Sequence, residues 1–495
     1  MTILRSRTAL FKEWPLLLLP VFFVFHTYTE NIQLLPLTIA LELLIKYLLA
    51  GFLLAILFSY ILRSIRKGYI FALLVLSINF FFGPIHDLLK QYFKAAWITH
   101  YAVLLPLIFF VLLTSFIYLR KTKRTFPKLH KFLCIALLLL ISLDIFSLVT
   151  EANRAKMGIT QTTPFEITNC DTCHKPDVYF IVADEYAGNT ALRNLLQFNN
   201  DSFETSLKRR GFHILNGSSS NYNFTPFSMA SVLSMDYLKG IRGINSNKED
   251  RTECNHLIAE NVAIRFFKKL GYEIINNSVF TIDNQLPKVR SFAFSLTGRE
   301  LITSQTLLGR MERDIRFNLM TTFKIKSEIT RFTNLEKDGI TTLYNETIKE
   351  ITRIHKKPVF TYTHLMMPHY PYFFDEHGNP NPPDSLLEGN QGSKRMYVGY
   401  LKYANARFQG LIDQIIAKSA QPPIIILMGD HGFRHTPTDN TMNYFYNLNA
   451  VYFPDRNYKD FADSSTLVNQ FRLVLNSQFG QHLPILANKH YLIQD

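Results

Sequence analysis

The chain has 495 residues with a formal net charge of +14, and 47% of its residues are hydrophobic while only 19% are charged. This composition disfavours a wholly soluble or disordered chain, and the length suits two or three domains. The basic excess is uneven: residues 1–150 hold 15 Lys and Arg against 5 Asp and Glu, whereas the remainder is nearly neutral. Basic clusters beside apolar stretches are typical of membrane proteins, so we expect no nucleic-acid partner.

Five apolar stretches in the first 150 residues are long enough, or nearly so, to cross a bilayer core about 30 Å thick as helices. They are about 14–29, 35–62, 69–89, 100–119 and 129–149. The first resembles a signal peptide, but it lacks a clear small-x-small cleavage site and four more spans follow, so we expect it to be retained. Residues 1–150 are therefore predicted to form a five-span transmembrane domain.

Basic residues fall on one side of these spans. They are Arg5, Arg7, Lys12, Arg63, Arg66, Lys67, Arg120, Lys121, Lys123, Arg124, Lys128 and Lys131. The other side holds only Lys90 and Lys94. By the positive-inside rule, the N-terminus is cytoplasmic and the chain after residue 150 lies outside the cytoplasm.

Glu42 and Lys46 are ionisable residues inside the second predicted span. Their i,i+4 spacing places them on one helix face, where they can neutralise each other. Two interpretations stay open, a self-paired structural contact near the outer interface or a site for a lipid headgroup.

Four cysteines are present. Cys134 lies in the fifth span, whereas Cys170 and Cys173 form a single CxxC outside the cytoplasm, where oxidation is permitted. We expect a local disulfide there, or one involving Cys254.

Residues 151–176 are polar and irregular and are predicted to be a linker. From 177 to 495, β-branched runs alternate with amphipathic stretches, as in a doubly wound α/β domain. Three continuous apolar runs suit central parallel strands, and polar residues follow each one. These runs end before Asp184-Glu185, at His364 and before Asp430-His431. Because ligands of such sheets gather beyond the carboxyl ends of the strands, we expect these side chains to converge.

Asp184, Glu185, Asp430 and His431 together make a mixed oxygen and nitrogen set that suits Zn²⁺ or Mn²⁺. Taken singly, each residue could instead be a helix cap or a core histidine. Thr225 lies between a polar loop and an apolar helical run, with Pro226 in the first turn. It could be only an N-cap, but a hydroxyl held at a helix N-terminus beside a divalent cation could also attack phosphorus.

These motifs resemble those of the alkaline phosphatase superfamily, in its sulfatase-like branch. The resemblance rests on Tyr179-Phe-Ile-Val-Ala-Asp184-Glu185, Asn221-Tyr-Asn-Phe-Thr225-Pro-Phe-Ser228, Met367-Pro-His369-Tyr-Pro371 and Gly429-Asp430-His431-Gly432. With its five spans, nearly the whole chain is similar to the membrane-anchored group of lipid A phosphoethanolamine transferases, lipoteichoic acid synthases and glucan phosphoglycerol transferases. The resemblance implies a catalytic α/β domain with a mostly parallel central sheet.

The resemblance also implies residue roles. Glu185, with Asp184 beside it, matches the metal-binding carboxylate, and Asp430 and His431 match the remaining ligands of one or two divalent ions. Thr225 matches a nucleophile that also touches the metal and carries a covalent phospho-intermediate.

Three histidines complete the expected site. His369 matches a group that contacts the transferred phosphate. His364 is a further candidate for substrate binding, and His364 and His435 are candidates for supporting groups or for a second metal.

Two departures bear on the activity. The chain lacks the C/S-x-P-x-R motif from which sulfatases proper make formylglycine, so sulfate-ester hydrolysis by that route is not expected. The first motif reads Ala-Asp-Glu where phosphoethanolamine transferases have Gly-Glu.

The expected function is transfer of a substituted phosphate, of the phosphoethanolamine or phosphoglycerol type, from a membrane phospholipid to a glycan or lipid of the cell envelope. The resemblance implies a bacterial inner-membrane protein with a periplasmic catalytic domain. The alternatives are a phosphoesterase or sulfatase-like hydrolase and a non-catalytic membrane-anchored binding module.

Overall fold

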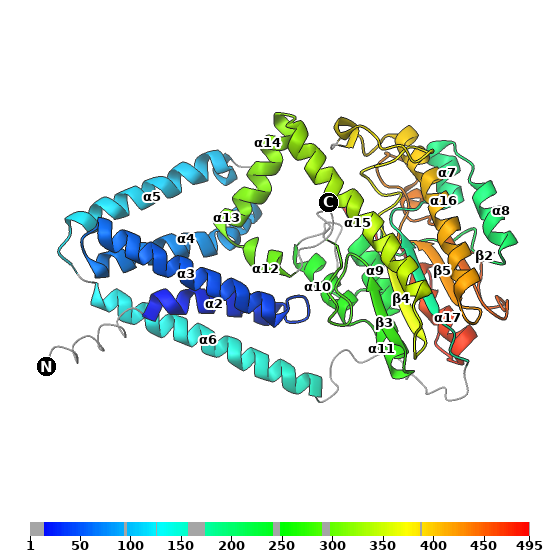
Figure 1. The fold of residues 1–495 in the computed structure, drawn as a ribbon, viewed down its shortest axis with the longest axis horizontal. Coiled ribbons are helices and arrows are strands. Elements are labelled where there is room, and N and C mark those ends of the chain that lie inside the picture. Colours follow the sequence, from blue (N-terminus) through cyan, green and yellow to red (C-terminus); the bar gives the residue numbers. More distant parts are fainter. Residues whose placement is uncertain are drawn as a thin grey trace. The chain divides into compact units, whose positions relative to one another are not determined.

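The computed structural model describes residues 14–93, 97–124, 126–156, 174–240, 248–289, 298–386 and 389–494 (Figure 1). The chain forms two compact units. The first comprises Met1–Thr162 and Leu296–Leu319, and the second comprises Thr163–Ser295 and Met320–Asp495. Cys170 and Cys173 lie outside the described residues, and Cys254 is a buried free thiol.

The first unit is built from long apolar helices. They are α2 (Trp14–Glu30), α3 (Leu37–Ile61), α4 (Ile65–Tyr92), α5 (Tyr101–Lys121) and α6 (Pro127–Lys156). Four of them are long and apolar enough to cross a membrane, namely α3, α4, α5 and residues Pro127–Thr150 of α6. The described part of α2 is also apolar but has only 17 residues. Each of the five expected spans thus coincides with a helix, and four satisfy the length and hydropathy of a span.

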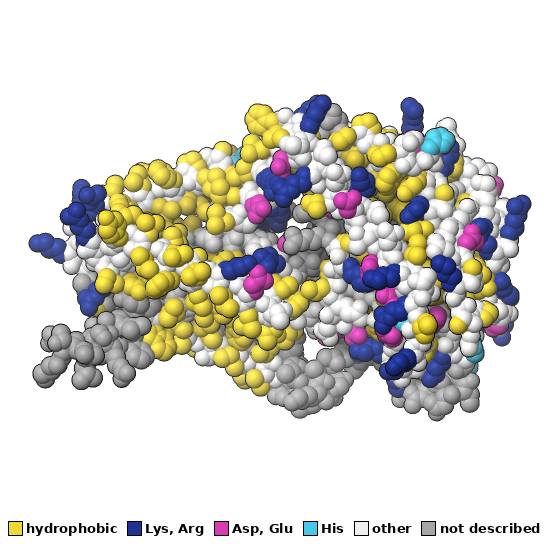
Figure 2. Space-filling view, in the orientation of Figure 1, with side chains coloured by type: hydrophobic (Ala, Val, Ile, Leu, Met, Phe, Trp, Pro, Cys, Tyr) yellow, Lys and Arg dark blue, Asp and Glu magenta, His cyan; other side chains and the backbone are white. Residues whose placement is uncertain are grey.

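Hydrophobic side chains dominate the surface of this unit (Figure 2). Exposed examples are Leu53 on α3, Phe110 on α5 and Phe146 on α6, which are 57 to 68% exposed. Such a surface is costly in water but suits contact with lipid chains. The first unit is therefore a membrane anchor.

A segment from the second half of the sequence belongs to this membrane unit. Between Leu296 and Leu319 it forms α12 (Arg299–Thr303), α13 (Leu307–Arg310), the π-helix η3 (Met311–Ile315) and the start of α14 (Arg316–Thr322). Ile302 is fully buried among side chains of the membrane helices. The sequence indicated no such excursion within 177–495.

Polar contacts fix this segment to one end of the helices. Arg310, whose side chain is 6% exposed, donates two hydrogen bonds to the carboxylate of Asp87 near the end of α4, at 2.8 and 2.7 Å. The Gly83 N–H donates to the Gln305 carbonyl at 2.8 Å, and a Cβ at Gly83 would lie only 2.6 Å from that oxygen. Glycine is therefore required for this approach.

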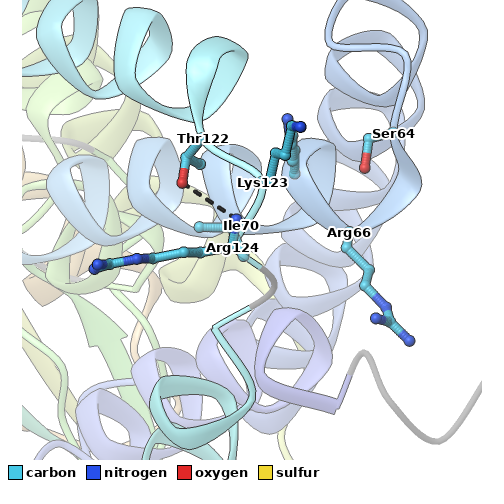
Figure 3. Close-up of a pocket in the computed structure, with 7 residues that line it drawn as sticks. Ser64, Arg66, Ile70, Thr122, Lys123 and Arg124 are labelled. Atoms are coloured by element: carbon cyan, nitrogen blue, oxygen red, sulfur yellow. Dashed lines mark hydrogen bonds between the residues drawn. The ribbon is translucent and has the colours of Figure 1, made fainter.

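The opposite end of the helices carries basic residues. A hollow of about 340 Å³ lies between the start of α4 and the end of α5. Figure 3 shows Arg66, Lys123 and Arg124 at this hollow with their side chains pointing away from one another, while the Thr122 hydroxyl accepts from the Arg124 N–H. These cations do not converge on a common point.

The second unit contains a six-stranded sheet in the order β2-β6-β5-β1-β4-β3. The strands are β1 (Val178–Ala183), β2 (His213–Ile214), β3 (Glu273–Asn277), β4 (Val359–Leu365), β5 (Ile424–Gly429) and β6 (Asn449–Tyr452). β1 lies between β4 and β5 and is parallel to both, and β3 is parallel to β4. β6 is antiparallel to β5, and β2 is antiparallel to β6. The three apolar runs therefore form the adjacent central parallel strands, which confirms the predicted fold class.

Both faces of the sheet are covered by helices. Phe180 on β1 contacts the ring of Phe471 on α17 (Gln470–Phe479), and Phe267 on α11 (Val262–Lys269) contacts Phe360 on β4, with ring centroids 5.0 and 4.4 Å apart. On the other face, the Thr363 hydroxyl of β4 lies 2.7 Å from that of Thr347 on α15 (Lys326–Thr352). This burial on both sides explains why the central strands are apolar without alternation.

The remaining elements surround the sheet. The helices are α7 (Asn189–Leu196), α8 (Asp201–Arg209), α9 (Thr225–Ser234), α10 (Lys248–Ala259), α11 (Val262–Lys269), α15 (Lys326–Thr352), α16 (Lys394–Lys418) and α17 (Gln470–Phe479). Short 3₁₀ turns are η2 (Trp97–Thr99) in the membrane unit and η4 (Pro383–Leu386), η5 (Thr441–Tyr444) and η6 (Leu467–Asn469) in the second unit.

Candidate active site

The site begins where β1 ends, at Asp184 and Glu185, which are both fully buried. Glu185 has a φ of 56°, in the left-handed region that a non-glycine residue rarely adopts. Its backbone is held there because its N–H donates to Asp430 Oδ1 at 2.8 Å and the Tyr397 hydroxyl donates to its carbonyl at 2.7 Å. Strained backbone maintained by such contacts is typical of functional sites.

The end of β5 supplies the second pair, Asp430 and His431, also fully buried. A Cβ on Gly429 would lie 2.3 Å from the Tyr186 carbonyl oxygen, so only glycine lets the two strand ends approach this closely. The Ser228 hydroxyl of α9 donates to the Asp430 carbonyl at 2.6 Å and ties that helix to the strand end.

Thr225 is the first residue of α9, and Phe224 takes the N-cap position without a side-chain cap. The Thr225 hydroxyl lies 3.2 Å from His431 Nε2. His431 Nδ1 lies 2.8 Å from the Gly432 carbonyl, which can only accept, so Nδ1 carries a proton and Nε2 is the ring nitrogen directed at the cluster. The hydroxyl therefore points into the acid and histidine cluster rather than capping its own helix.

The acidic and histidine side chains form two groups, each of which could hold a divalent metal ion. In one group are Asp184, Asp430 and His431, and in the other are Glu185, His369 and His435; the candidate ligand atoms within each group lie within 4.8 Å of one another. His435 Nε2 lies 3.3 Å from Glu185 Oε1, and His369 Nε2 lies 4.0 Å from Glu185 Oε2. The expected ligands thus come together, but Asp184 and Glu185 belong to different groups.

Burial and neighbouring charges set the protonation of these side chains. Burial raises the pKa of Asp184 well above its usual range, and the nearby carboxylates of Asp430 and Glu185 raise it further. Burial also raises the pKa of Glu185, but His435 and His369 outweigh this effect and hold it well below its usual range. Burial lowers the pKa of His369 to about 4, so this imidazole is neutral near pH 7 and can act as a ligand.

His364 lies behind the first group rather than facing a substrate. Its Nε2 is 2.9 Å from Asp184 Oδ2, its Nδ1 is 2.8 Å from the Tyr362 hydroxyl, and its ring is fully buried. Of the roles that the sequence predicts for His364, substrate binding or support of a metal ligand, these contacts favour the second, because they orient the Asp184 carboxylate. The reason is the strand itself, because His364 is still within β4 and its side chain is held against the sheet.

Several ligand atoms of the two groups lack a hydrogen-bond partner, which fits a site that binds metal ions. Within the described residues, Asp184 Oδ1, Asp430 Oδ2, Glu185 Oε2 and His435 Nε2 are buried and have no hydrogen-bond partner. Buried polar atoms are normally paired, and unpaired carboxylate oxygens are especially costly. Four such atoms shared between the two groups are explained if divalent cations complete them.

Two arginines add positive charge beside the nucleophile candidate. The guanidinium carbons of Arg434 and Arg251 lie 4.3 and 4.8 Å from the centre of the Phe224 ring, one residue before Thr225. The backbone N–H of Arg434 also donates to Glu185 Oε1 at 3.2 Å. The motifs gave no reason to place Arg251 or Tyr397 here, because both reach the site from distant helices.

A helix-covered, mostly parallel sheet that gathers buried acids, histidines and a hydroxyl at its strand ends is an arrangement suited to holding divalent ions beside a nucleophile. The family model for sulfatases matches residues 145–474, two thirds of the chain. The chain belongs to the sulfatase family, as the resemblance implied.

Comparison with solved structures gives distant similarities. The C-terminal periplasmic domain of EptC from Escherichia coli is 12% identical with a TM-score of 0.39, and the match covers 63% of this chain and 84% of that one. For the phosphoethanolamine transferase EptC of Campylobacter jejuni the values are 14%, 0.38, 64% and 92%. For a phosphonate monoester hydrolase of Agrobacterium radiobacter they are 11%, 0.36, 61% and 74%. No curated protein matches the sequence.

Proposed function

We propose that the protein transfers a substituted phosphate from a membrane phospholipid to a hydroxyl of a cell-envelope glycan or lipid. The observation that carries this proposal is the Thr225 hydroxyl, buried at the start of α9 and 3.2 Å from His431 Nε2 in the acid and histidine cluster. A threonine cannot become formylglycine, so the nucleophile is the hydroxyl itself.

The reaction has two balanced steps. Thr225 Oγ forms a bond to phosphorus, the bond from phosphorus to the lipid oxygen breaks, and diacylglycerol leaves with a proton. The acceptor hydroxyl then attacks the phospho-threonine, its oxygen bonds to phosphorus, and Thr225 Oγ is released and regains a proton. Both steps take place at Thr225 Oγ, as is general for covalent catalysis by a protein nucleophile.

The surrounding residues have distinct tasks. A Zn²⁺ or Mn²⁺ ion held by Asp184, Asp430 and His431, and a second one held by Glu185, His369 and His435, would lower the pKa of a bound hydroxyl and offset phosphate charge. The N-terminal N–H groups of α9 favour an anion at Thr225. Arg434 and Arg251 beside Phe224 add positive charge, which suits a substrate that is anionic at phosphorus.

The membrane unit supports a lipid donor, because an enzyme anchored in the bilayer meets its substrate there. We place the N-terminus in the cytoplasm and the catalytic unit in the periplasm of a bacterium. The basic residues at one end of the helices and the docking of Leu296–Leu319 at the other support this orientation.

The test is mass spectrometry of the purified full chain after incubation with phospholipid vesicles. We expect a mass increment on Thr225 that equals the substituted phosphate, and none in Thr225→Ala, whose turnover should fall by about 10³-fold or more. Thr225→Ser is the matched control, because it keeps a hydroxyl and should keep the increment.

The acceptor decides between transfer and hydrolysis, which share the first step. If diacylglycerol accumulates and the substituted phosphate is found on a glycan, the protein is a transferase. If the substituted phosphate is instead released into water, the protein is a phosphoesterase. A fully active Thr225→Ala variant would overturn both.

A further inference from the structure

Three charged side chains form a group on the surface of the membrane unit. Lys46 Nζ donates to Glu42 Oε1 at 2.6 Å, and Arg299 Nη2 donates to the same oxygen at 2.7 Å. The pair on α3 is the one that the sequence singled out, and Arg299 reaches it from α12, more than 250 residues further along the chain. Figure 2 shows basic and acidic side chains set together within the hydrophobic surface of this unit.

The group carries one uncompensated positive charge. Both cations share a single carboxylate oxygen, and within the described part of the chain Glu42 is the only acid within ion-pair distance of either one. The side chains of Arg299, Glu42 and Lys46 are 40, 44 and 55% exposed, so further donors on the two cations are accessible. The pair of Glu42 and Lys46 alone would be neutral, and Arg299 makes the group cationic.

The charged group is surrounded by exposed apolar side chains that suit contact with a lipid acyl chain. Glu42 and Lys46 lie five and nine residues after the start of α3, about 8 and 14 Å along the helix. Their neighbours Leu41, Ile45 and Leu49 are 48 to 65% exposed and cover the same stretch with apolar surface. A cationic group within the end of a span is costly unless an anion joins it.

The end of the helices at which the group lies is also defined. The segment that carries Arg299 binds Asp87 at the end of α4 through Arg310, and its Asp314 accepts from the Tyr101 hydroxyl at the start of α5. The basic residues Arg66 and Lys123 lie at the opposite end, where they point apart (Figure 3). Lys46 and Arg299, in contrast, converge, because both donate to Glu42 Oε1.

We propose that Lys46 and Arg299 bind the phosphodiester of a phospholipid whose acyl chains lie along α3. A phosphodiester carries one negative charge, which matches the charge of the group, and the guanidinium fork and the ammonium can both donate to its oxygens. That this lipid is the donor for Thr225 rests on the proposed function, whereas the binding itself does not.

The test is native mass spectrometry of the full chain in detergent with three added lipids of identical acyl chains: phosphatidylglycerol, phosphatidylethanolamine and diacylglycerol. We expect the two phospholipids to be retained and diacylglycerol not to be. In Lys46→Gln/Arg299→Gln the retained phospholipid should fall about tenfold or more, since each cation near an anionic lipid contributes appreciably. Glycerophosphoglycerol, which has the headgroup but no chains, should not be retained.

Matched variants separate binding from folding. Arg316→Gln removes a cation from the same segment without touching Glu42 and should retain lipid like the wild type. Glu42→Gln removes the competing carboxylate and should retain at least as much. Retention by the double variant equal to that of the wild type, or loss in Glu42→Gln to the same extent, would show that the group is only a structural contact.

The donor assignment has its own outcome. Thr225→Ala should bind lipid normally and transfer nothing, and the double variant should raise KM for vesicle lipid with kcat preserved. If Thr225→Ala remained active, the proposed function would fail while the lipid site stood. If the double variant bound lipid normally, the lipid site would fail while the proposed function stood.

Discussion

At the scale of single residues, the site depends on two neighbours that point apart. Asp184 and Glu185 are consecutive, and side chains at consecutive positions leaving a strand face opposite directions. Asp184 therefore joins Asp430 and His431, while Glu185, with its left-handed backbone, joins His369 and His435. One strand end thereby serves two ligand groups.

This division predicts separate metal losses. We expect the purified protein to bind two equivalents of Zn²⁺, Asp430→Asn to lose one and His435→Gln to lose the other, because each variant removes a ligand from one group only. Inductively coupled plasma mass spectrometry of protein dialysed against limiting zinc gives the stoichiometry. A wild-type value of one, with both variants empty, would mean that the two groups serve a single ion.

At the scale of elements, the catalytic unit relies on its central parallel strands. β1 contributes Phe180, fully buried, whose ring contacts those of Tyr362 and Phe471 at 5.2 and 5.0 Å. Because the strand end carries Asp184 and Glu185, packing beneath it fixes the position of the site.

Phe180→Ala should destabilise the protein by about 3–5 kcal/mol, since it removes a large buried side chain and leaves a cavity. Thermal unfolding of the detergent-solubilised full chain, monitored by circular dichroism and light scattering, should show a lower Tm. Ile354→Ala, at a side chain that is 95% exposed, is the control and should leave Tm unchanged. Equal transitions for the two variants would contradict the assignment of β1 to the core.

At the scale of the whole molecule, the chain enters the membrane unit twice, first through α2 to α6 and again through Leu296–Leu319. The second entry is held by the bidentate contact of Arg310 with Asp87. The membrane unit is therefore completed by residues that lie within the sequence of the catalytic half.

The orientation can be tested on intact spheroplasts of a bacterium expressing the protein. We expect external protease to cleave the catalytic half after residue 177, while the basic loop between α5 and α6 is protected until the membrane is permeabilised, as the positive-inside rule requires. Immunoblots with tags at both termini distinguish the fragments. Protection of the catalytic half in intact spheroplasts would reverse the proposed topology.

The apolar helices, the three central strands and the residues that follow them could all be predicted from the amino-acid sequence. These features follow from local physics: long apolar runs suit membrane spans, continuous apolar strands suit a buried parallel sheet, and polar residues beyond the strands must meet at one edge. Most of the net charge of +14 lies in residues 1–150, beside the apolar helices, where it indicates membrane topology rather than nucleic-acid binding.

Three features required the folded chain: which acid joins which histidine, where His364 lies and which residue joins Glu42. Each depends on contacts between positions far apart in the chain: Glu185 with His435, Asp184 with His364, and Arg299 with Glu42. Sequence spacing carries no information on such contacts, because chain distance does not measure distance in space once helices and strands have packed. The site could be located from its motifs, but its division into two ligand groups required the fold.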